Sequence, residues 1–288
     1  MSEPNPPPGG GFLSPRRFDV PEAIFTPEQL PPDARLMASA VEEFVRGEVV
    51  PANARLEAHE PGLMESLLRR AGALGILGMA VPERFGGLDL PKSQIALLTA
   101  AMGVHPSFAI SAGVHAGVAT LPLLLFGTEE QQARYLPGLA SGERIGAFAL
   151  SEAGSGSDAL AAQAKAALAP DGSHYVLNGE KMWITNGAFA DLFTLFAKDE
   201  RGGLTAFLVE RDSPGLTASR EEEKLGLRGS STTRVVLDGV RVPAANVLGE
   251  PGKGHRPALY ALNLGRFAIA ATALGMCVES LRIATRYA

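Results

Sequence analysis

Two kinds of sequence pattern occupy separate stretches of this 288-residue chain, and their order most constrains the fold. From Pro32 to about Ala140, apolar residues recur at steps of three and four, which indicates helices. From Gly146, short runs of β-forming residues alternate with turn residues, as in an antiparallel sandwich or barrel. A helical pattern returns near Arg256-Pro257. We therefore expect an α+β multidomain protein.

The changes of pattern divide the chain into four predicted parts. Residues 1–32 are rich in proline and glycine, which predicts an extended leader. We expect an N-terminal all-α domain over residues 33–145 and a middle antiparallel β-barrel or sandwich domain over residues 146–252. Residues 253–288 are predicted to begin a C-terminal helical bundle. Because the last helical pattern has no C-terminal stop signal, we interpret the chain as truncated within that bundle.

Several helices can be placed within these parts. The first domain contains a leucine face and two apolar helical stretches, namely Leu63, Leu67, Leu68 and Leu74, then Pro91–Met102 and Val114–Phe126. Thr128 and Gln131 have the spacing of a capping box, which predicts a helix from there to about Leu139. The uncharged run Phe267–Val278 is too short to cross a bilayer and is predicted to be a buried helix segment.

The middle part contains six predicted strands: Ala147–Leu150, Tyr175–Leu177, Lys181–Thr185, Leu192–Ala197, Leu204–Val209 and Thr233–Leu237. Asn178-Gly179 predicts a tight hairpin, and Arg201-Gly202-Gly203 and Asp238-Gly239 are predicted turns. Trp183, the only tryptophan, and Thr185 lie two residues apart and are expected on one face of their strand. Such a pair suits a planar, hydrogen-bonding ligand, although a single tryptophan also commonly fills a β-domain core.

Composition excludes several classes of protein. The formal net charge is −5 and no block of basic residues occurs, which argues against a nucleic-acid-binding face. The single cysteine, Cys277, lies in an apolar run and is predicted to be a small core residue. The five histidines lack metal-ligand spacing, so no metal is expected: His59, His105, His115, His174 and His255. The N-terminus lacks signal- and transit-peptide patterns, and we expect a soluble, cytoplasmic protein without a transmembrane segment.

The segment Gly146–Asp158 runs from a predicted strand into a loop dense in glycine and serine. Converging backbone N–H groups and hydroxyls in such a loop suit phosphate groups. The loop is not a Walker A motif, because no Gly-Lys-Ser/Thr follows it. It also lacks the third glycine and the βαβ context of the dinucleotide fingerprint, and Gly252-Lys-Gly254 is not a P-loop either. A plain turn remains the alternative for the loop alone.

This loop, followed by Asn178-Gly-Glu-Lys-Met-Trp-Ile-Thr-Asn186, resembles the acyl-CoA dehydrogenase family. Further segments resemble the family in the same order: Phe126-Gly-Thr-Glu-Glu-Gln-Gln132, Tyr135-Leu-Pro-Gly-Leu-Ala-Ser-Gly-Glu143, Lys224-Leu-Gly-Leu-Arg-Gly-Ser-Ser-Thr-Thr233, Val242-Pro-Ala-Ala-Asn-Val-Leu-Gly249 and Leu262-Asn-Leu-Gly-Arg266. In the leader, residues 9–13 and 25–28 resemble the very-long-chain branch and its bacterial relatives.

The resemblance implies an FAD site. Its cofactor contacts would be Phe148, Leu150, Ser151, Gly156, Ser157, Trp183, Ile184 and Thr185. In the family, the first three positions lie beside the isoalloxazine ring, the next two approach the pyrophosphate, the tryptophan packs on the ring, and the threonine hydroxyl lies near flavin N5. Ser151 stands where the family usually has threonine, and Ala153 where it usually has proline.

The resemblance also implies a reaction. A carboxylate removes the α-proton of an acyl-CoA thioester while the β-carbon hydride passes to flavin. Ser157, Asn263 and Arg266 occupy family positions near the substrate, although Arg266 could instead form a helix-packing ion pair. Gly265 occupies the base position of one branch and has no side chain, so we assign no base here and expect it beyond Ala288. Glu152 is predicted to be structural.

We therefore expect part of a long-chain acyl-CoA dehydrogenase of fatty-acid β-oxidation. Its substrate would be an acyl-CoA, its electron acceptor electron-transferring flavoprotein, and the complete protein a homodimer. The alternatives are a non-catalytic fragment that binds flavin or acyl-CoA, and a same-fold acyl-CoA oxidase or flavin monooxygenase.

Overall fold

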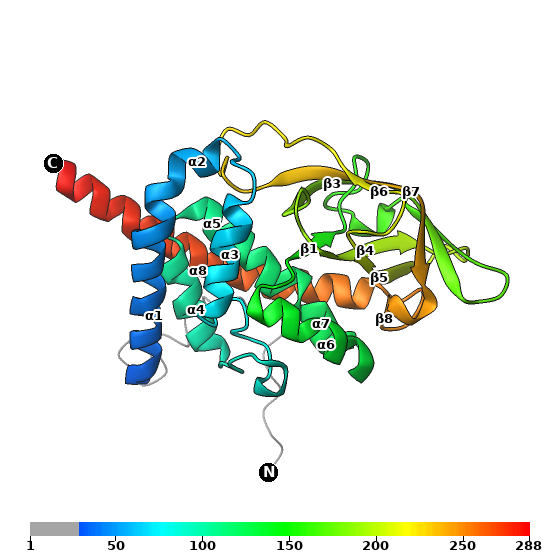
Figure 1. The fold of residues 1–288 in the computed structure, drawn as a ribbon, viewed down its shortest axis with the longest axis horizontal. Coiled ribbons are helices and arrows are strands. Elements are labelled where there is room, and N and C mark those ends of the chain that lie inside the picture. The colour runs from blue at the N-terminus through cyan, green and yellow to red at the C-terminus, as the bar shows by residue number, and fades with distance from the viewer. Residues whose placement is uncertain (1–28) are drawn as a thin grey trace, which may run out of the picture.

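The computed structural model describes residues 29–288, so the leader lies outside the described residues except for its last four positions. The leader segments that resemble the very-long-chain branch also lie outside them. Figure 1 shows a group of helices beside a β-sheet, with the last helix extending from the sheet across the helices. The helix–sheet–helix order and the α+β fold class are therefore confirmed.

Seven α-helices precede the sheet within the described residues: α1 (Pro32–Phe44), α2 (Asn53–Glu57), α3 (Leu63–Ala73), α4 (Lys92–Met102), α5 (Pro106–Val114), α6 (Leu121–Phe126) and α7 (Glu129–Ser141). A π-helical turn, η7 (His115–Ala119), joins α5 to α6. The predicted helix over 114–126 therefore comprises this turn and α6, and the sequence analysis missed α5. Further short segments are η4 (Val45–Val49), η5 (Val50–Ala52) and η6 (Glu83–Phe85).

Local signals explain where α7 and α3 lie. The Thr128 hydroxyl accepts from the Gln131 N–H at 3.2 Å, and the Gln131 side chain accepts from the Thr128 N–H at 3.1 Å. This confirms the predicted capping box and satisfies two N–H groups at the start of α7. In α3, Leu67 and Leu68 are buried as predicted, whereas Leu74 lies past the helix end and is exposed.

The sheet has eight strands: β1 (Gly146–Ala149), β2 (Lys165–Leu168), β3 (His174–Thr185), β4 (Leu192–Lys198), β5 (Leu204–Glu210), β6 (Leu216–Ala218), β7 (Thr232–Pro243) and β8 (Val247–Leu248). Their order is β6-β7-β3-β2-β4-β5-β8, with β1 beside β4. Most neighbours are antiparallel, but β1 and β2 each pair with β4 in parallel, so the sheet is mixed. Two 3-10 turns, η8 (Ala159–Ala161) and η9 (Ala244–Asn246), complete the middle part.

The predicted hairpin at Asn178-Gly179 is wrong, because β3 continues through it as one strand. The pairing of β3 with β7 shifts there, and the extra residue lies in β7, where Asp238 and Gly239 oppose Asn178 and form a bulge. Asp238-Gly239 lies opposite within β7 and is likewise no turn, and the Gly239 N–H donates to the Asn178 side chain at 2.8 Å. A Cβ added at Gly179 would lie 2.8 Å from Ala164, so glycine serves close packing against the start of β2.

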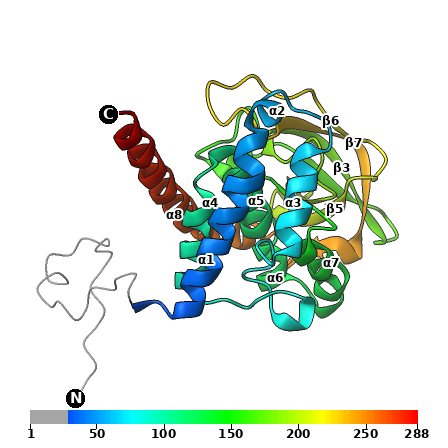
Figure 2. The ribbon, with the colours of Figure 1, turned by 60° about the vertical axis from the view of Figure 1, so that its left-hand side comes forward.

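Helix α8 (His255–Tyr287) begins where predicted but is not buried as predicted. Phe267, Leu274 and Val278 are exposed, as is the thiol of Cys277, so both the buried segment and the core role of Cys277 are corrected. Only one side of α8 packs against the helical part, and α4 lies between α1 and α8 (Figure 2). Two helical stretches, 106–126 and 255–287, pass a length and composition test for membrane spans, which core helices also pass; half of the first is buried.

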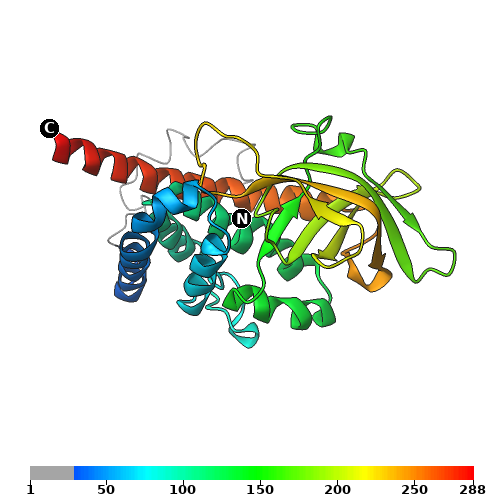
Figure 3. The same ribbon diagram turned by 45° about the horizontal axis from the view of Figure 1, so that its top comes forward.

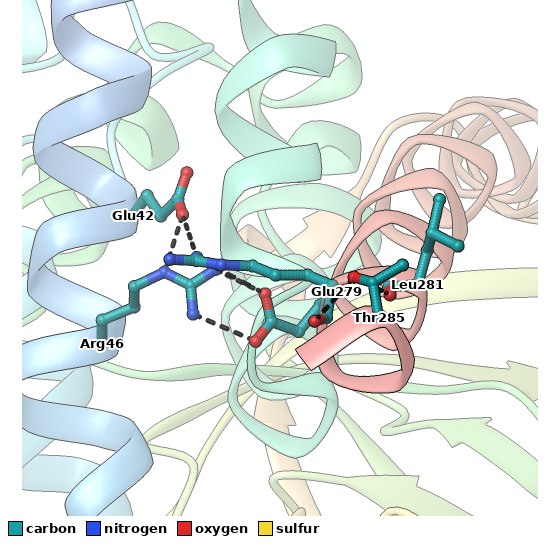
Figure 4. A network of polar contacts seen from close by, with 6 residues as sticks. Glu42, Arg46, Glu279, Leu281 and Thr285 are labelled. Atoms are coloured by element: carbon teal, nitrogen blue, oxygen red, sulfur yellow. Dashed lines mark hydrogen bonds and ion pairs between the residues drawn. The ribbon is translucent and has the colours of Figure 1, made fainter. Parts of the chain in front are cut away.

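The far half of α8 is held to α1 by an ion-pair network, which Figure 4 shows. The Arg46 guanidinium donates to both carboxylate oxygens of Glu279, at 3.0 and 2.5 Å, and to Glu42 at 2.7 Å. The two-point contact fixes the geometry of both side chains. The hydrogen bonds that Arg46 donates to Glu279 are the main cause that raises the pKa of Arg46, so this group stays charged.

Candidate functional site

A second bulge in the pairing of β3 with β7, this one formed by β3 itself, turns Trp183 outward. The pairing with β7 shifts between Lys181 and Ile184, and the backbone of Trp183 has φ of 55°. As a result Lys181 and Ile184 are both buried, whereas Trp183 is 57% exposed. The core-filling alternative for this tryptophan is therefore wrong. Positive φ at a bulky residue stores strain of about 1–3 kcal/mol, which is characteristic of functional sites.

Three hydroxyls of the expected site are free to bind a ligand. Within residues 29–288, the hydroxyls of Ser151, Ser157 and Thr185 have no hydrogen-bond partner. Thr185 is partly exposed at the end of β3, on the opposite side from its buried neighbour Ile184. The bulge therefore leaves Trp183 and Thr185 both accessible.

The Gly-Ser loop offers free backbone donors. Its first turn closes with hydrogen bonds in both directions between the backbones of Glu152 and Ser155. After it, the backbone N–H groups of Gly156 and Ser157 have no partner among the described residues. A Cβ added at Gly156 would meet nothing within 4 Å, so the backbone is open to approach. This arrangement can bind an anion.

Other predicted contacts are restricted to the backbone. The side chains of Leu150 and Ile184 are buried in the hydrophobic core, so only their main-chain groups can face a ligand. Phe148 is half-buried in β1 and packs edge-on against Phe196, with ring centroids 5.1 Å apart. These residues form the apolar support of the site.

A buried ion pair that the sequence analysis missed lies behind this surface. The Lys181 ammonium donates to the Glu152 carboxylate at 2.6 Å, and both side chains are buried. Burial lowers the pKa of Lys181. Burial alone would raise the pKa of Glu152, but hydrogen bonds from Lys181 and the Gln163 N–H outweigh it and hold this pKa below its usual value. Lys181 continues the alternation of the buried Tyr175 and Leu177 in β3, so its position predicts the buried face, but a single sequence gives no signal for its partner Glu152.

Two polar side chains, also missed by the sequence analysis, attach β1 to the helical part. The Gly146 N–H donates to His115 Nδ1 at 2.8 Å, and His115 Nε2 donates to the Leu139 carbonyl at 2.9 Å. Asn186, after β3, donates to the carbonyls of Gly146 and Ser111 at 3.2 and 3.0 Å. Complete burial lowers the pKa of His115 to about 4, so its ring is neutral at pH 7. In a single sequence, neither residue carries a signal for this role.

Two apolar cavities flank α8. The first, of about 270 Å³, lies between α4, η7 and α8, and its walls include Ile95, Thr99, Gly113, Gly117, Leu264 and Phe267. The second, of about 280 Å³, lies between α5, η7 and α8 and includes Ile110, Val118 and Gly265. Gly113 and Ala268 border both, and among residues 29–288 no carboxylate lines either of them.

The predicted substrate residues lie on α8. Arg266 borders the second cavity and donates to the Asn263 side chain at 2.5 Å. Within the part of the chain that the structure describes, Arg266 forms no ion pair, so the helix-packing alternative is not supported. A Cβ at Gly265 would lie 2.9 Å from Val118, so the neighbouring side chain already fills the space that a side chain at this position would need.

Together these features define a helix–sheet–helix protein with an exposed aromatic ring, hydroxyls and loop N–H groups that have no partner among the described residues, and apolar cavities along its last helix. Two family models match the chain: the acyl-CoA dehydrogenase N-terminal domain over residues 31–143 and the acyl-CoA dehydrogenase middle domain over residues 147–240. The chain belongs to the acyl-CoA dehydrogenase family.

Several relatives agree with this assignment. A probable acyl-CoA dehydrogenase of Bacillus subtilis is 45% identical over 97% of this chain and 47% of its own length, and a second acyl-CoA dehydrogenase of that organism is 42% identical over 88% and 67%. The human very long-chain specific enzyme is 45% identical over 70% of this chain and 32% of its own. The crystal structure of a Bacillus anthracis acyl-CoA dehydrogenase complexed with FAD superposes with a TM-score of 0.90, at 45% identity, over 92% of this chain and 45% of that one. The chain thus spans about half the length of the first of these relatives.

Proposed function

We propose that this chain carries the flavin-binding and acyl-binding parts of an FAD-dependent acyl-CoA dehydrogenase that acts on long-chain substrates in fatty-acid β-oxidation. The observation that carries the proposal is the exposed Trp183 ring, with hydroxyls that have no partner among the described residues at Thr185, two residues on, and at Ser151, whose carbonyl accepts from the Met182 N–H. A soluble protein rarely exposes its only tryptophan on a strained strand without a ligand to cover it.

The donor set fits FAD. A flat ring system with a polar edge can stack on Trp183 and accept hydrogen bonds from Ser151 and Thr185. A pyrophosphate can accept from the free N–H groups of Gly156 and Ser157. The FAD complex of the Bacillus anthracis relative supports this assignment, because that protein and this chain share the fold at 45% identity.

When bound, FAD supplies the hydride-accepting chemistry of the family reaction. The residues of this chain bind and orient. Thr185 would hold the reactive edge of the ring by a hydrogen bond, and Trp183 would shield one face from water. The loop after β1 would fix the phosphate end, so that the ring cannot turn away from the acyl group.

The first cavity would hold the acyl chain. It extends from Leu264 on α8, past α4, to Met79 and Leu90 in the connection before α4, and its walls are almost entirely apolar. The element α5–η7 joins it to the flavin surface, since Asn186 bonds to Ser111 and Gly113 lines the cavity two residues later. The apolar walls favour an acyl chain, and the similarity to the human very long-chain enzyme supports the choice of a long one.

The proton acceptor would come from outside the described residues. No carboxylate lines either cavity, and Glu152 is occupied by Lys181 and two backbone N–H groups. We propose that the base lies beyond Ala288, as in most of the family, and that Asn263 and Arg266 contact the substrate. In the complete protein we also propose a homodimer, electron transfer to electron-transferring flavoprotein, and a cytoplasmic location.

Flavin binding can be tested directly, because Trp183 is the only tryptophan. FAD added to the purified chain should quench the emission of this residue and lose flavin fluorescence itself, and Trp183→Phe should still bind FAD but more weakly. Palmitoyl-CoA should then shift the flavin absorbance with little dye reduction. A chain that cannot be loaded with FAD would contradict the proposal. Robust turnover by these residues alone would instead place the base within them.

A further inference from the structure

Behind the Trp183 surface, Lys181 and Glu152 form a network in which each charge has several partners. Lys181 is fully buried, and its ammonium donates to Glu152 at 2.6 Å and to the Leu150 carbonyl at 3.2 Å. The Glu152 carboxylate also accepts from the backbone N–H groups of Gln163 at 2.5 Å and Ala164 at 3.1 Å. The pair therefore joins the end of β1, the start of β2 and the middle of β3.

Stability alone does not account for such a pair. Removing two charges from water is expensive, and well-packed apolar residues commonly replace a buried pair without loss of stability. A buried pair can instead specify one arrangement among several, because any other arrangement leaves a charge unpaired. The question is which arrangement this pair specifies.

The contacts of the network surround the residues that face the proposed flavin. Lys181 bonds to the carbonyl of Leu150, and the next residue, Met182, donates its N–H to the Ser151 carbonyl at 2.9 Å. Ser151 is thus tied to β3 immediately beside the bulge that turns Trp183 outward. Lys181 is also the last paired residue before that bulge, so its buried ammonium fixes where the strand leaves its register.

We propose that Lys181 and Glu152 are positioning residues for the cofactor: their ion pair fixes the bulge that exposes Trp183 and holds Ser151 beside it, so that the flavin-binding surface exists before flavin binds. Neither side chain touches the ligand, because both lie beneath the surface. The proposal rests on the proposed function for the identity of the ligand. The placement of Trp183 and Ser151 is a property of the chain itself.

A double substitution distinguishes a role of the ion pair in placing the flavin-binding surface from a role in stability alone. Lys181→Met leaves Glu152 buried without its partner, so this variant should unfold more easily. Lys181→Met combined with Glu152→Gln removes both charges and should recover most of the lost stability. If the pair positions the site, the double variant should nevertheless retain a loosened bulge and bind FAD poorly.

A matched control lies on the same strand. Glu180 precedes Lys181 and pairs with Arg234 at 3.1 Å, but both side chains are about half exposed. Glu180→Gln removes a charge from β3 without touching the buried network. This variant should match the unsubstituted chain in every measurement, since exposed pairs contribute little.

The experiment compares the unsubstituted chain, Lys181→Met, Glu152→Gln, the double variant and Glu180→Gln. Acrylamide quenching of Trp183 without flavin reports on the bulge, urea midpoints report on stability, and FAD titration reports on binding. In the double variant we expect a near-normal urea midpoint, about twofold weaker quenching because the bulge no longer holds Trp183 outward, and at least about tenfold weaker FAD binding. Glu152→Gln should show the same two site effects, which keeps the test open if Lys181→Met does not fold.

The other outcomes contradict either the positioning role of the ion pair or the proposed function. A double variant with unchanged Trp183 quenching and FAD affinity overturns the positioning role. One that does not fold shows that the pair is required for stability, which overturns it as well. If the unsubstituted chain itself binds no FAD, the proposed function fails, while flavin-free quenching of Trp183 still decides whether the pair holds the bulge.

Discussion

His115 should make the stability of this protein depend on pH in a way that one substitution abolishes. Its ring lies fully buried between α7 and β1, and burial lowers its pKa from 6.5 to about 4. In the unfolded chain the ring takes up a proton near pH 6.5, whereas in the folded chain it stays neutral until about pH 4. The contribution of the neutral His115 ring to the free energy of unfolding is therefore complete above pH 6.5 and is lost progressively as the pH falls toward 4.

The size of the effect follows from the two pKa values. One pKa unit corresponds to about 1.4 kcal/mol, and proton linkage between pKa values of 6.5 and about 4 gives a loss of about 2 kcal/mol between pH 7.5 and pH 5. The loss reaches about 3 kcal/mol near pH 4. Other groups titrate in the same range, so the prediction concerns the difference between two proteins and not the absolute slope.

His115→Gln provides that comparison. The amide oxygen of glutamine can accept from the Gly146 N–H and its nitrogen can donate to the Leu139 carbonyl, which replaces both contacts of the ring without a titrating group. Urea unfolding followed by far-UV circular dichroism at pH 7.5, 6.0 and 5.0 should show that the unsubstituted chain loses about 2 kcal/mol more than the variant, at matched m values. Parallel pH profiles would refute the reasoning, because the buried ring would then not be neutral.

Three other substitutions test the cavity, the sheet and α8. Gly117→Leu should leave the free energy of unfolding unchanged, since a Cβ at this position meets no atom within 4 Å. Its side chain can enter the first cavity, so calorimetry should show a larger loss of affinity for palmitoyl-CoA than for butyryl-CoA relative to the unsubstituted chain. Each methylene excluded from the cavity loses about 0.8 kcal/mol of binding free energy. Gly179→Val should lower the free energy of unfolding by roughly 1–3 kcal/mol, because φ is 144° and Ala164 lies 2.8 Å from the new Cβ; an unchanged urea midpoint would contradict this. Glu279→Gln should lower the thermal midpoint slightly through its contact with Arg46, at about 1 kcal/mol, whereas Glu60→Gln in the exposed pair with Arg55 should not.

The sequence was most informative where local chemistry determines structure. The capping box at Thr128 and Gln131 fixes the start of α7 through bonds between neighbours, so it could be predicted. Asn178-Gly179 misled because the dipeptide is typical of a turn, whereas in the fold it continues a strand and lies opposite a bulge in β7, which only the pairing of the two strands reveals. The exposure of Phe267–Val278 could not be predicted either, because an apolar helix has the same pattern whether or not a neighbour covers it.

In the candidate site, too, local motifs could be predicted from the sequence, whereas contacts between distant residues could not. Trp183, Thr185 and the Gly-Ser loop were found because ligand-facing residue types lie in short, continuous motifs. The residues that hold them in place were missed because their partners are distant in sequence: Lys181 bonds to Glu152 across 29 positions and Asn186 to Ser111 across 75. Such pairings depend on the completed fold, and a single sequence gives no signal for them.

One element, α5–η7, links the two halves of the site. Figure 3 shows α8 running from the sheet across the helical part, so that it crosses the boundary between them. Within the continuous helix from α5 into η7, Gly113 and Gly117 line the first cavity, while His115 between them bonds to Leu139 and Gly146. A π-helical turn widens the helix and changes which residues share a face, and such turns are frequent at functional sites. Here the turn lets adjacent residues serve opposite sides, so that the cavity wall and the anchor of β1 belong to one rigid element. A ligand that filled the cavity would therefore lie at a fixed distance from the strand that leads into the Gly-Ser loop, and mutations in η7 should affect acyl and flavin binding together.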